Sequence, residues 1–263
     1  MRQAKRRQSR LGIRPSVSGN ELGTATDFLP RQVRRRLGLM ATTSVAALFA
    51  GLILATPVPA DAANFVCDWT SATSSTWNIA GNWSACNSTF PNNGADTFDA
   101  RILVDGVYTV TLSTNVTVNS LVLDATGANI NHNASTLTLA GGGPITITSG
   151  TYNLNGGTIS GATIQQTGTN RLVLGSNGGL TGVTLRGDLV TSGGTLAIAS
   201  GLTLLTEAGA APGTANLTNT SVAFTNTQTF NNATVNLSGS FGSTLAVDGN
   251  STLTLGAGAV VQG

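Results

Sequence analysis

From residue 102 to residue 263 the chain alternates apolar and polar positions in short runs, each ending near a glycine. The repeated phrase is a polar, usually small residue, then leucine, any residue, a second aliphatic residue and, shortly after, glycine. A two-residue period predicts a β-strand that buries one face, and the glycine indicates a turn. Strands this short cannot bury their apolar faces alone, so the repeat predicts a solenoid of stacked copies. The clearest copies are residues 120–123, 136–139, 171–174, 195–198, 244–247 and 252–255.

A second repeat indicates where the chain turns between strands. Residues 159–164 match residues 180–185 at a shift of 21, and residues 217–222 and 230–235 follow the same pattern. The third position is always Gly or Asn, which tolerate a positive φ, as at the corner of a coil. A period near 21 predicts one coil of a parallel β-helix with three short faces. The spacing then drifts to 37 and 13, which indicates unequal coils or a loop, with residues 208–214 as the best candidate for that loop.

The predicted fold class is all-β, with a parallel β-helix as the first interpretation and a β-sandwich as the alternative. A sandwich also uses short strands and frequent turns, and hairpin-like Asx-Gly pairs begin at Asp105, Asn155 and Asp248. The matching motif is nevertheless a corner within a strand pair, which favours the helix. This interpretation predicts about eight coils, with leucines stacked inside and Asn ladders at corners.

Residues 1–62 have the layout of a secretory leader. Ten of the 13 Lys and Arg residues precede Leu37, an uncharged run follows to Ala55, and Ala60-Asp61-Ala62 has small residues at both outer positions. This order predicts a signal peptide cleaved after Ala62, with cleavage after Ala60 as the alternative. An uncleaved membrane anchor is the other interpretation, because the uncharged run approaches the ~20 residues that span a bilayer. The only membrane contact that we expect is through this segment.

Removing the leader reverses the charge of the protein. The whole chain carries a formal +2, whereas residues 63–263 hold three basic and eight acidic residues and thus a net charge of −5. Because a nucleic-acid ligand requires a basic stripe that displaces counterions, we expect no nucleic-acid partner. The partners that we expect are surface glycans or proteins of a host or neighbouring cell, together with self-association through solenoid edges.

Residues 63–101 differ from the repeats, because they hold all three tryptophans and both cysteines. A solenoid end exposes its core and its strand edges, and aromatic rings cover such an end efficiently. Trp69, Trp77 and Trp83 are therefore predicted to form an N-terminal cap, with a glycan-binding platform as the alternative. Because an exported chain meets an oxidising compartment, Cys67 and Cys86 are predicted to form a disulfide. The predicted organisation is residues 1–62 as leader, residues 63–101 as cap and residues 102–263 as solenoid.

The motifs in and after this cap carry a resemblance to a known family. They are Trp69, Ser75-Thr76-Trp77-Asn78, Asn82-Trp83-Ser84, Pro91, Asp96, Phe98, Val110-Thr111-Leu112 and Val118-Asn119-Ser120-Leu121-Val122-Leu123. This pattern resembles the start of bacterial autotransporter-type passenger proteins with β-strand repeats. The resemblance implies a right-handed parallel β-helix displayed on or released from a bacterial surface. No outer-membrane barrel pattern or sorting tail follows the repeats, so we expect the solenoid to be incomplete at its C-terminus.

The sequence gives no sign of catalysis, and we expect a protein without enzymatic activity, cofactor or metal. Acid–base cleavage of a glycan requires two carboxylates held together, whereas the acidic residues are scattered along the chain. His132, the only histidine, lies in the polar stretch Asn131-His132-Asn133 and is predicted to occupy a surface loop. A glycan-binding or polysaccharide-degrading β-helix is the alternative function.

Threonine pairs raise one more alternative, an ice-binding β-helix, which would need them aligned on one flat face. Their spacing along the chain is irregular, and Thr is also common at outward-facing strand positions. The sequence therefore favours an exported, non-catalytic structural or adhesive β-solenoid of a bacterial cell surface or extracellular matrix. The pairs are Thr109 with Thr111, Thr136 with Thr138, Thr146 with Thr148, and Thr252 with Thr254.

Overall fold

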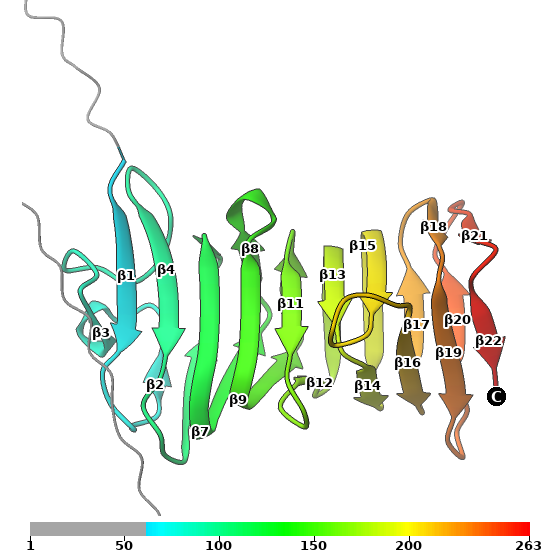
Figure 1. Cartoon of the computed structure of the whole chain (residues 1–263), viewed down its shortest axis with the longest axis horizontal. Helices are drawn as coiled ribbons and strands as arrows, with labels where there is room; N and C mark the ends of the chain where they lie inside the picture. Colours follow the sequence, from blue (N-terminus) through cyan, green and yellow to red (C-terminus); the bar gives the residue numbers. More distant parts are fainter. Residues whose placement is uncertain (1–61) are drawn as a thin grey trace, which may run out of the picture. The chain divides into compact units, whose positions relative to one another are not determined.

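The computed structural model describes residues 62–263, and this part of the chain is a parallel β-solenoid of about seven turns (Figure 1). Among the described strands, the one antiparallel strand pair joins β1 (Asn64–Trp69) to β3 (Trp83–Ser84). The parallel β-helix is therefore confirmed, and the β-sandwich, which needs antiparallel sheets, is wrong. Residues 1–61 of the predicted leader, including most of its cleavage site, lie outside the described residues.

Three faces run along the stack, each built from strands of successive coils. Face A contains β6 (Val116–Val118), β8 (Thr136–Leu139), β10 (Thr158–Ser160), β17 (Ser221–Phe224) and β20 (Thr244–Val247). Face B contains β1, β4 (Thr97–Ile102), β11 (Thr163–Gln166), β18 (Gln228–Phe230) and β21 (Leu253–Leu255). Face C contains β2 (Ser75–Thr76), β5 (Tyr108–Leu112), β12 (Leu172–Leu174), β14 (Leu189–Ser192), β16 (Gly213–Thr218), β19 (Ala233–Ser238) and β22 (Val260–Gln262).

Four longer strands bend around a corner and so belong to two faces. β7 (Ser120–Asn133) and β9 (Pro144–Asn155) run from face B to face C. β13 (Asn177–Arg186) and β15 (Thr195–Leu205) run from face A to face B. Within residues 62–263, helical structure is limited to the short turns η1 (Ala80–Asn82) and η2 (Ala140–Gly142), and no helix there is long and apolar enough to cross a bilayer.

The corner motif of the sequence has the backbone conformation predicted for it. Gly161 and Gly182 have φ values of 66° and 59°, and Asn219 and Asn232 have values of 51° and 52°. The shift of 21 is also confirmed, because Ile159 pairs with Leu180 across neighbouring coils. The four copies nevertheless occupy different corners: the two glycines turn the chain from face A to face B, Asn219 from C to A, and Asn232 from B to C.

The drift in spacing therefore has two causes, a change of corner and a change of coil length. On face A, Leu180 pairs with Ile198 and Ile198 pairs with Phe224, so the second of these coils is clearly longer than the first. Part of the longer coil is a loop between β15 and β16, which confirms the predicted loop up to Pro212. Its predicted last two residues, 213 and 214, are instead the start of β16, because Gly213 pairs with Ala233.

The interior is filled by columns of aliphatic side chains, one residue from each coil. Such a side chain contributes about 1.5–3 kcal/mol when fully buried, so the columns are the main source of stability. The alternation of buried and outward residues along each strand follows the predicted two-residue period. One column lies under face A and contains Leu137, Ile159, Leu180, Ile198 and Phe224. Another lies under face B and contains Leu121, Ile145, Ile164, Leu185 and Leu204.

The N-terminal segment is both the first coil of the solenoid and its cap. β1 pairs in parallel with β4, which in turn pairs with β7, so the stack already begins at Asn64. The predicted boundary between residues 101 and 102 falls inside β4. An aromatic cluster lies at this end of the stack, which confirms the predicted aromatic-rich cap; Figure 1 shows β1 and β3 at this end.

Candidate functional site

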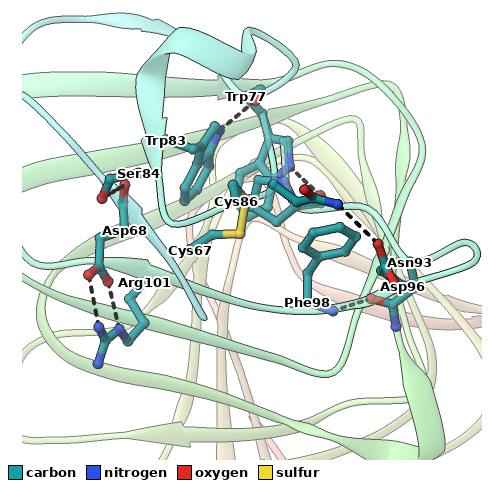
Figure 2. Close-up of a disulfide and its surroundings, with 12 residues drawn as sticks. Cys67, Asp68, Trp77, Trp83, Ser84, Cys86, Asn93, Asp96, Phe98 and Arg101 are labelled. Carbon is teal, nitrogen blue, oxygen red and sulfur yellow. Dashed lines mark hydrogen bonds and ion pairs between the residues drawn. A yellow bond between two sulfur atoms is a disulfide. The ribbon is translucent and has the colours of Figure 1, made fainter. Parts of the chain in front are cut away.

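The predicted disulfide between Cys67 and Cys86 is present, and it ties the first coil to the cap (Figure 2). Cys67 belongs to β1, and Cys86 follows β3, with their Cα atoms 4.9 Å apart. Both residues are buried. The two cysteines are separated by 19 positions in the sequence, and all three tryptophans lie between them, so the bridge holds the aromatic cluster against β1.

The three tryptophans form the interior of the cap and not a binding surface. Trp83 packs edge-on against Trp69 and Trp77, with ring centroids 5.2 and 4.7 Å away. At most 6% of each residue is exposed, so no ring face is open for a sugar to stack on, and the glycan-platform alternative is wrong. Each buried indole N–H donates to a backbone oxygen, that of Ser71 for Trp69, Pro91 for Trp77 and Trp77 for Trp83.

An ion pair joins the two strands beneath the cap, as Figure 2 shows. Arg101 of β4 donates from Nε and one terminal nitrogen to the two carboxylate oxygens of Asp68 in β1, at 2.6 and 2.8 Å. It is the one ion pair within residues 62–263, and both side chains are more than a third exposed. Such pairs contribute about 1 kcal/mol or less, so this contact aligns two strands and adds little stability.

His132 is buried in β7, and its predicted place in a surface loop is wrong. Its ring lies inside the solenoid, where Nε2 contacts the carbonyl oxygen of Ser135 at 3.0 Å and Nδ1 contacts the Tyr152 hydroxyl at 2.9 Å. Burial lowers the pKa of His132 to about 4. The missed signal is the alternation of Ile130, His132 and the flanking asparagines, which continues the strand and directs the ring inward.

Face C presents an extended surface without charged side chains, which is polar except at Val173, Val190 and Val260. No outward residue in its strand segments is Asp, Glu, Lys or Arg. Asn236 in β19 donates to Asn216 in β16, and Gln262 in β22 donates to Asn236, each at 2.7 Å. Asn155 also donates to Asn131 near the other end of the face. The predicted asparagine ladders therefore exist, although they run along the middle of a face and not only at corners.

The four threonine pairs do not form one ladder. The first pair lies in β5 on face C, the second in β8 on face A, the third in β9 on face B, and the last at β21 on face B. An ice-binding surface requires such pairs in register on a single face, so the ice-binding alternative has no structural support.

Charged residues that are far apart in the sequence meet at the corner between faces B and C. A cleft of about 290 Å³ is lined there by Arg171, Asp188 and Glu207 from three successive coils, together with Gln166, Gly168, Gly187 and Thr206. Gln166 is buried at its base, where Nε2 donates to the Asp188 carbonyl at 3.1 Å and Oε1 accepts from the Leu172 amide at 2.7 Å. The interpretation that the acidic residues are scattered is therefore wrong for Asp188 and Glu207.

Coil length explains why the sequence does not reveal this cleft. The step from Arg171 to Asp188 and the step from Asp188 to Glu207 are both shorter than the period of 21, so neither follows the repeat. The carboxylates of Asp188 and Glu207 are exposed to solvent. Within residues 62–263, no three His, Cys, Asp or Glu side chains gather as they would around a metal ion.

Comparison with known proteins does not identify a family for this chain. No protein-family model, curated protein or solved structure matches the chain. The class of protein that fold and site define is thus a disulfide-capped parallel β-solenoid with one uncharged polar face and one charged corner cleft.

Proposed function

We propose that this chain is an exported structural or adhesive β-solenoid of a bacterial cell surface or extracellular matrix, and that it acts without catalysis. The observation that carries this proposal is face C, whose outward side chains are mostly amides and hydroxyls, with asparagine ladders toward both ends of the stack and Val173 and Val190 between them. An extended uncharged face of this kind offers many weak hydrogen bonds to a large partner, which together give avidity. The partners that fit are surface glycans or surface proteins of a host or neighbouring cell.

Export is supported by the disulfide and by the leader-like composition of residues 1–62. Structural disulfides persist in oxidising compartments and are rare where thiols are kept reduced. The resemblance to autotransporter-type passengers agrees with this location and remains part of the proposal.

The export proposal is tested by expressing the full chain with its own leader in a bacterium and fractionating the culture. We expect the protein at the cell surface or in the medium, with a new N-terminus at Ala63. Recovery only from the cytoplasm, with an intact N-terminus and free thiols, would contradict export.

Adhesion is tested with beads that carry the full-length protein and are presented to bacterial or host cells. Arginine at two ladder positions, Asn216→Arg with Asn236→Arg, should reduce attachment, because the like charges disrupt the polar face without entering the core. Thr138→Arg with Thr181→Arg places the same charges on face A and is the matched control. Equal attachment of all three proteins would contradict an adhesive role for face C.

A second candidate function, cleavage of a polysaccharide, is favoured by the pair Asp188 and Glu207 in one cleft. Glycosidases use two carboxylates, one of which is usually held in an apolar environment. Here both residues are exposed, which supports binding over catalysis. Release of new reducing ends from a glycan by the wild-type protein, but not by Asp188→Asn or Glu207→Gln, would establish the enzyme instead.

A further inference from the structure

The charged cleft continues along the solenoid axis into a second, uncharged cleft. This neighbour has a volume of about 280 Å³ and lies at the same corner, between faces B and C, on the preceding coils. The two clefts adjoin at the turn that holds Gly168, Asn170 and Arg171. The uncharged cleft is lined by Thr126, Gly127, Ala128, Asn129, Ser149, Gly150, Thr151 and Asn170.

Glycines line four of the five levels of this groove, one at each of these levels. Gly127, Gly150, Gly168 and Gly187 have φ values of 81°, 82°, 61° and 104°, a region that other residues rarely adopt. A Cβ on Gly127 would lie 3.0 Å from the Gly106 oxygen, and a Cβ on Gly150 would lie 2.7 Å from the Ala128 oxygen. A side chain at Gly127 or Gly150 would therefore meet the neighbouring backbone, and the positive φ disfavours a side chain at all four positions.

We propose that the two clefts form one binding groove for a neutral, linear saccharide that lies along the solenoid axis. This inference rests on the proposed function, since it names a ligand for an exported, non-catalytic solenoid. From the level of Gly127 to that of Thr206 the groove spans four coil steps, or about 19 Å at ~4.8 Å per coil. That length accommodates a short oligosaccharide in an extended conformation.

The groups that line the groove match the hydroxyls of a sugar. Asn170 donates from Nδ2 to the Thr148 oxygen at 2.7 Å, which leaves its Oδ1 to accept from a ligand. Arg171 is fixed by donation from Nε to the Thr169 oxygen at 3.2 Å, so its guanidinium is held at the junction of the clefts. Asp188 and Glu207 supply hydrogen-bond acceptors at one end of the groove. At the other end, the hydroxyls of Ser149 and Thr151 can both donate and accept hydrogen bonds.

Charge and polarity decide between ligand classes. The charged cleft holds one arginine against two carboxylates, and residues 63–263 carry a net charge of −5, so a polyanion would be repelled. A peptide docks through apolar pockets or by adding a strand to a free sheet edge. Ala128 is the one apolar side chain that lines the two clefts, and they lie at a corner and not at a sheet edge. A neutral saccharide fits both observations.

The test is calorimetric titration of the full-length, purified protein with neutral and acidic oligosaccharides of increasing length. The neutral set contains β-1,4-linked glucose, xylose and N-acetylglucosamine oligomers, and the acidic set contains oligogalacturonates. We expect binding within the neutral set, with affinity rising until the oligomer spans both clefts. Arg171→Gln and Asp188→Asn should each raise the Kd at least tenfold, whereas the face A variant Thr138→Arg should leave it unchanged. Unfolding curves confirm that each variant is folded.

Several results would overturn the proposal that the groove binds a neutral saccharide. These are binding of the acidic set alone, absence of binding to every oligomer, and binding that Arg171→Gln and Asp188→Asn leave unaltered or that Thr138→Arg weakens equally. The cell-attachment test on face C is independent of this titration. Attachment of cells by a protein whose groove binds no saccharide would refute the saccharide site alone. Saccharide binding by a protein that does not attach to cells would refute the adhesive role of face C alone.

Discussion

The hydroxyl of Tyr152 donates a hydrogen bond to Nδ1 of His132 inside the solenoid, at a distance of 2.9 Å. The direction follows from the other ring nitrogen, because Nε2 contacts the Ser135 carbonyl oxygen, which can only accept. The imidazole therefore carries its proton on Nε2 and is neutral. Both side chains are buried, so protonation of His132 would place a charge in the core and remove its acceptor for Tyr152.

We predict that this pair makes the solenoid acid-sensitive. The pKa of His132 falls from 6.5 in the unfolded chain to about 4 in the fold, because burial penalises the charged ring. The unfolded chain binds more protons between these values, so this contribution is complete above pH 6.5 and is lost as the pH falls toward 4. It amounts to about 3 kcal/mol. Urea unfolding at several pH values checks this, and His132→Gln should lack this component of the pH dependence.

A direct titration of His132 is a second test of the same prediction. His132 is the single histidine of the chain, so its ring protons stand alone in an NMR spectrum. A midpoint near 6.5 in the folded protein, the value of an unperturbed histidine, would contradict the buried neutral ring.

An aspartate should affect stability very differently at Leu172 and at Val173, although the two residues are neighbours in β12. Leu172 is 3% exposed and points inward, whereas Val173 is partly exposed on face C. Leu172→Asp should lower stability by several kcal/mol, because it buries an unpaired charge. Val173→Asp should have little effect, and thermal unfolding of both variants is the measurement. Similar losses in the two variants would mean that the register of β12 is incorrect.

The disulfide should stabilise the cap without shaping the solenoid. On the chain-entropy model, a bridge that closes a loop of about 20 residues contributes about 3 kcal/mol. The double variant Cys67→Ser with Cys86→Ser should lose that amount in denaturant unfolding and keep the β-sheet circular dichroism of the wild type. Reduced wild-type protein serves as the control. Reaction of both native cysteines with a thiol label before reduction would refute the bridge.

Thr191 is a position where a substitution should raise stability. Its buried hydroxyl has no hydrogen-bond partner, and its neighbours in the column are Leu174 and Leu217. Thr191→Val removes the unsatisfied group and should add about 1 kcal/mol. Thr220→Val is the matched control, because the equally buried Thr220 hydroxyl donates to backbone oxygens and its loss should destabilise. Denaturant midpoints that move in the same direction would contradict this interpretation.

The sequence predicts what depends on local pattern and not what depends on alignment between coils. Leu180 and Gly182 reveal a strand and a corner by residue type alone, and the structure confirms both. The meeting of Arg171 with Asp188 requires knowledge that their coil is shorter than the period of 21, which no local pattern supplies. His132 shows a third case, in which a polar residue continues an apolar column because two partners satisfy its ring.

The loop between β15 and β16 shows that a coil of this solenoid can be lengthened without loss of stability. Thr191 pairs with Leu174 of the preceding coil and with Leu217 of the following one, and both pairs keep the ladder in register although the second coil is much the longer. The extra residues form a loop that projects from the corner, and the columns of side chains beneath keep their register. The corner between faces B and C is thus a natural insertion site, where new recognition segments can be added while the interior remains unchanged.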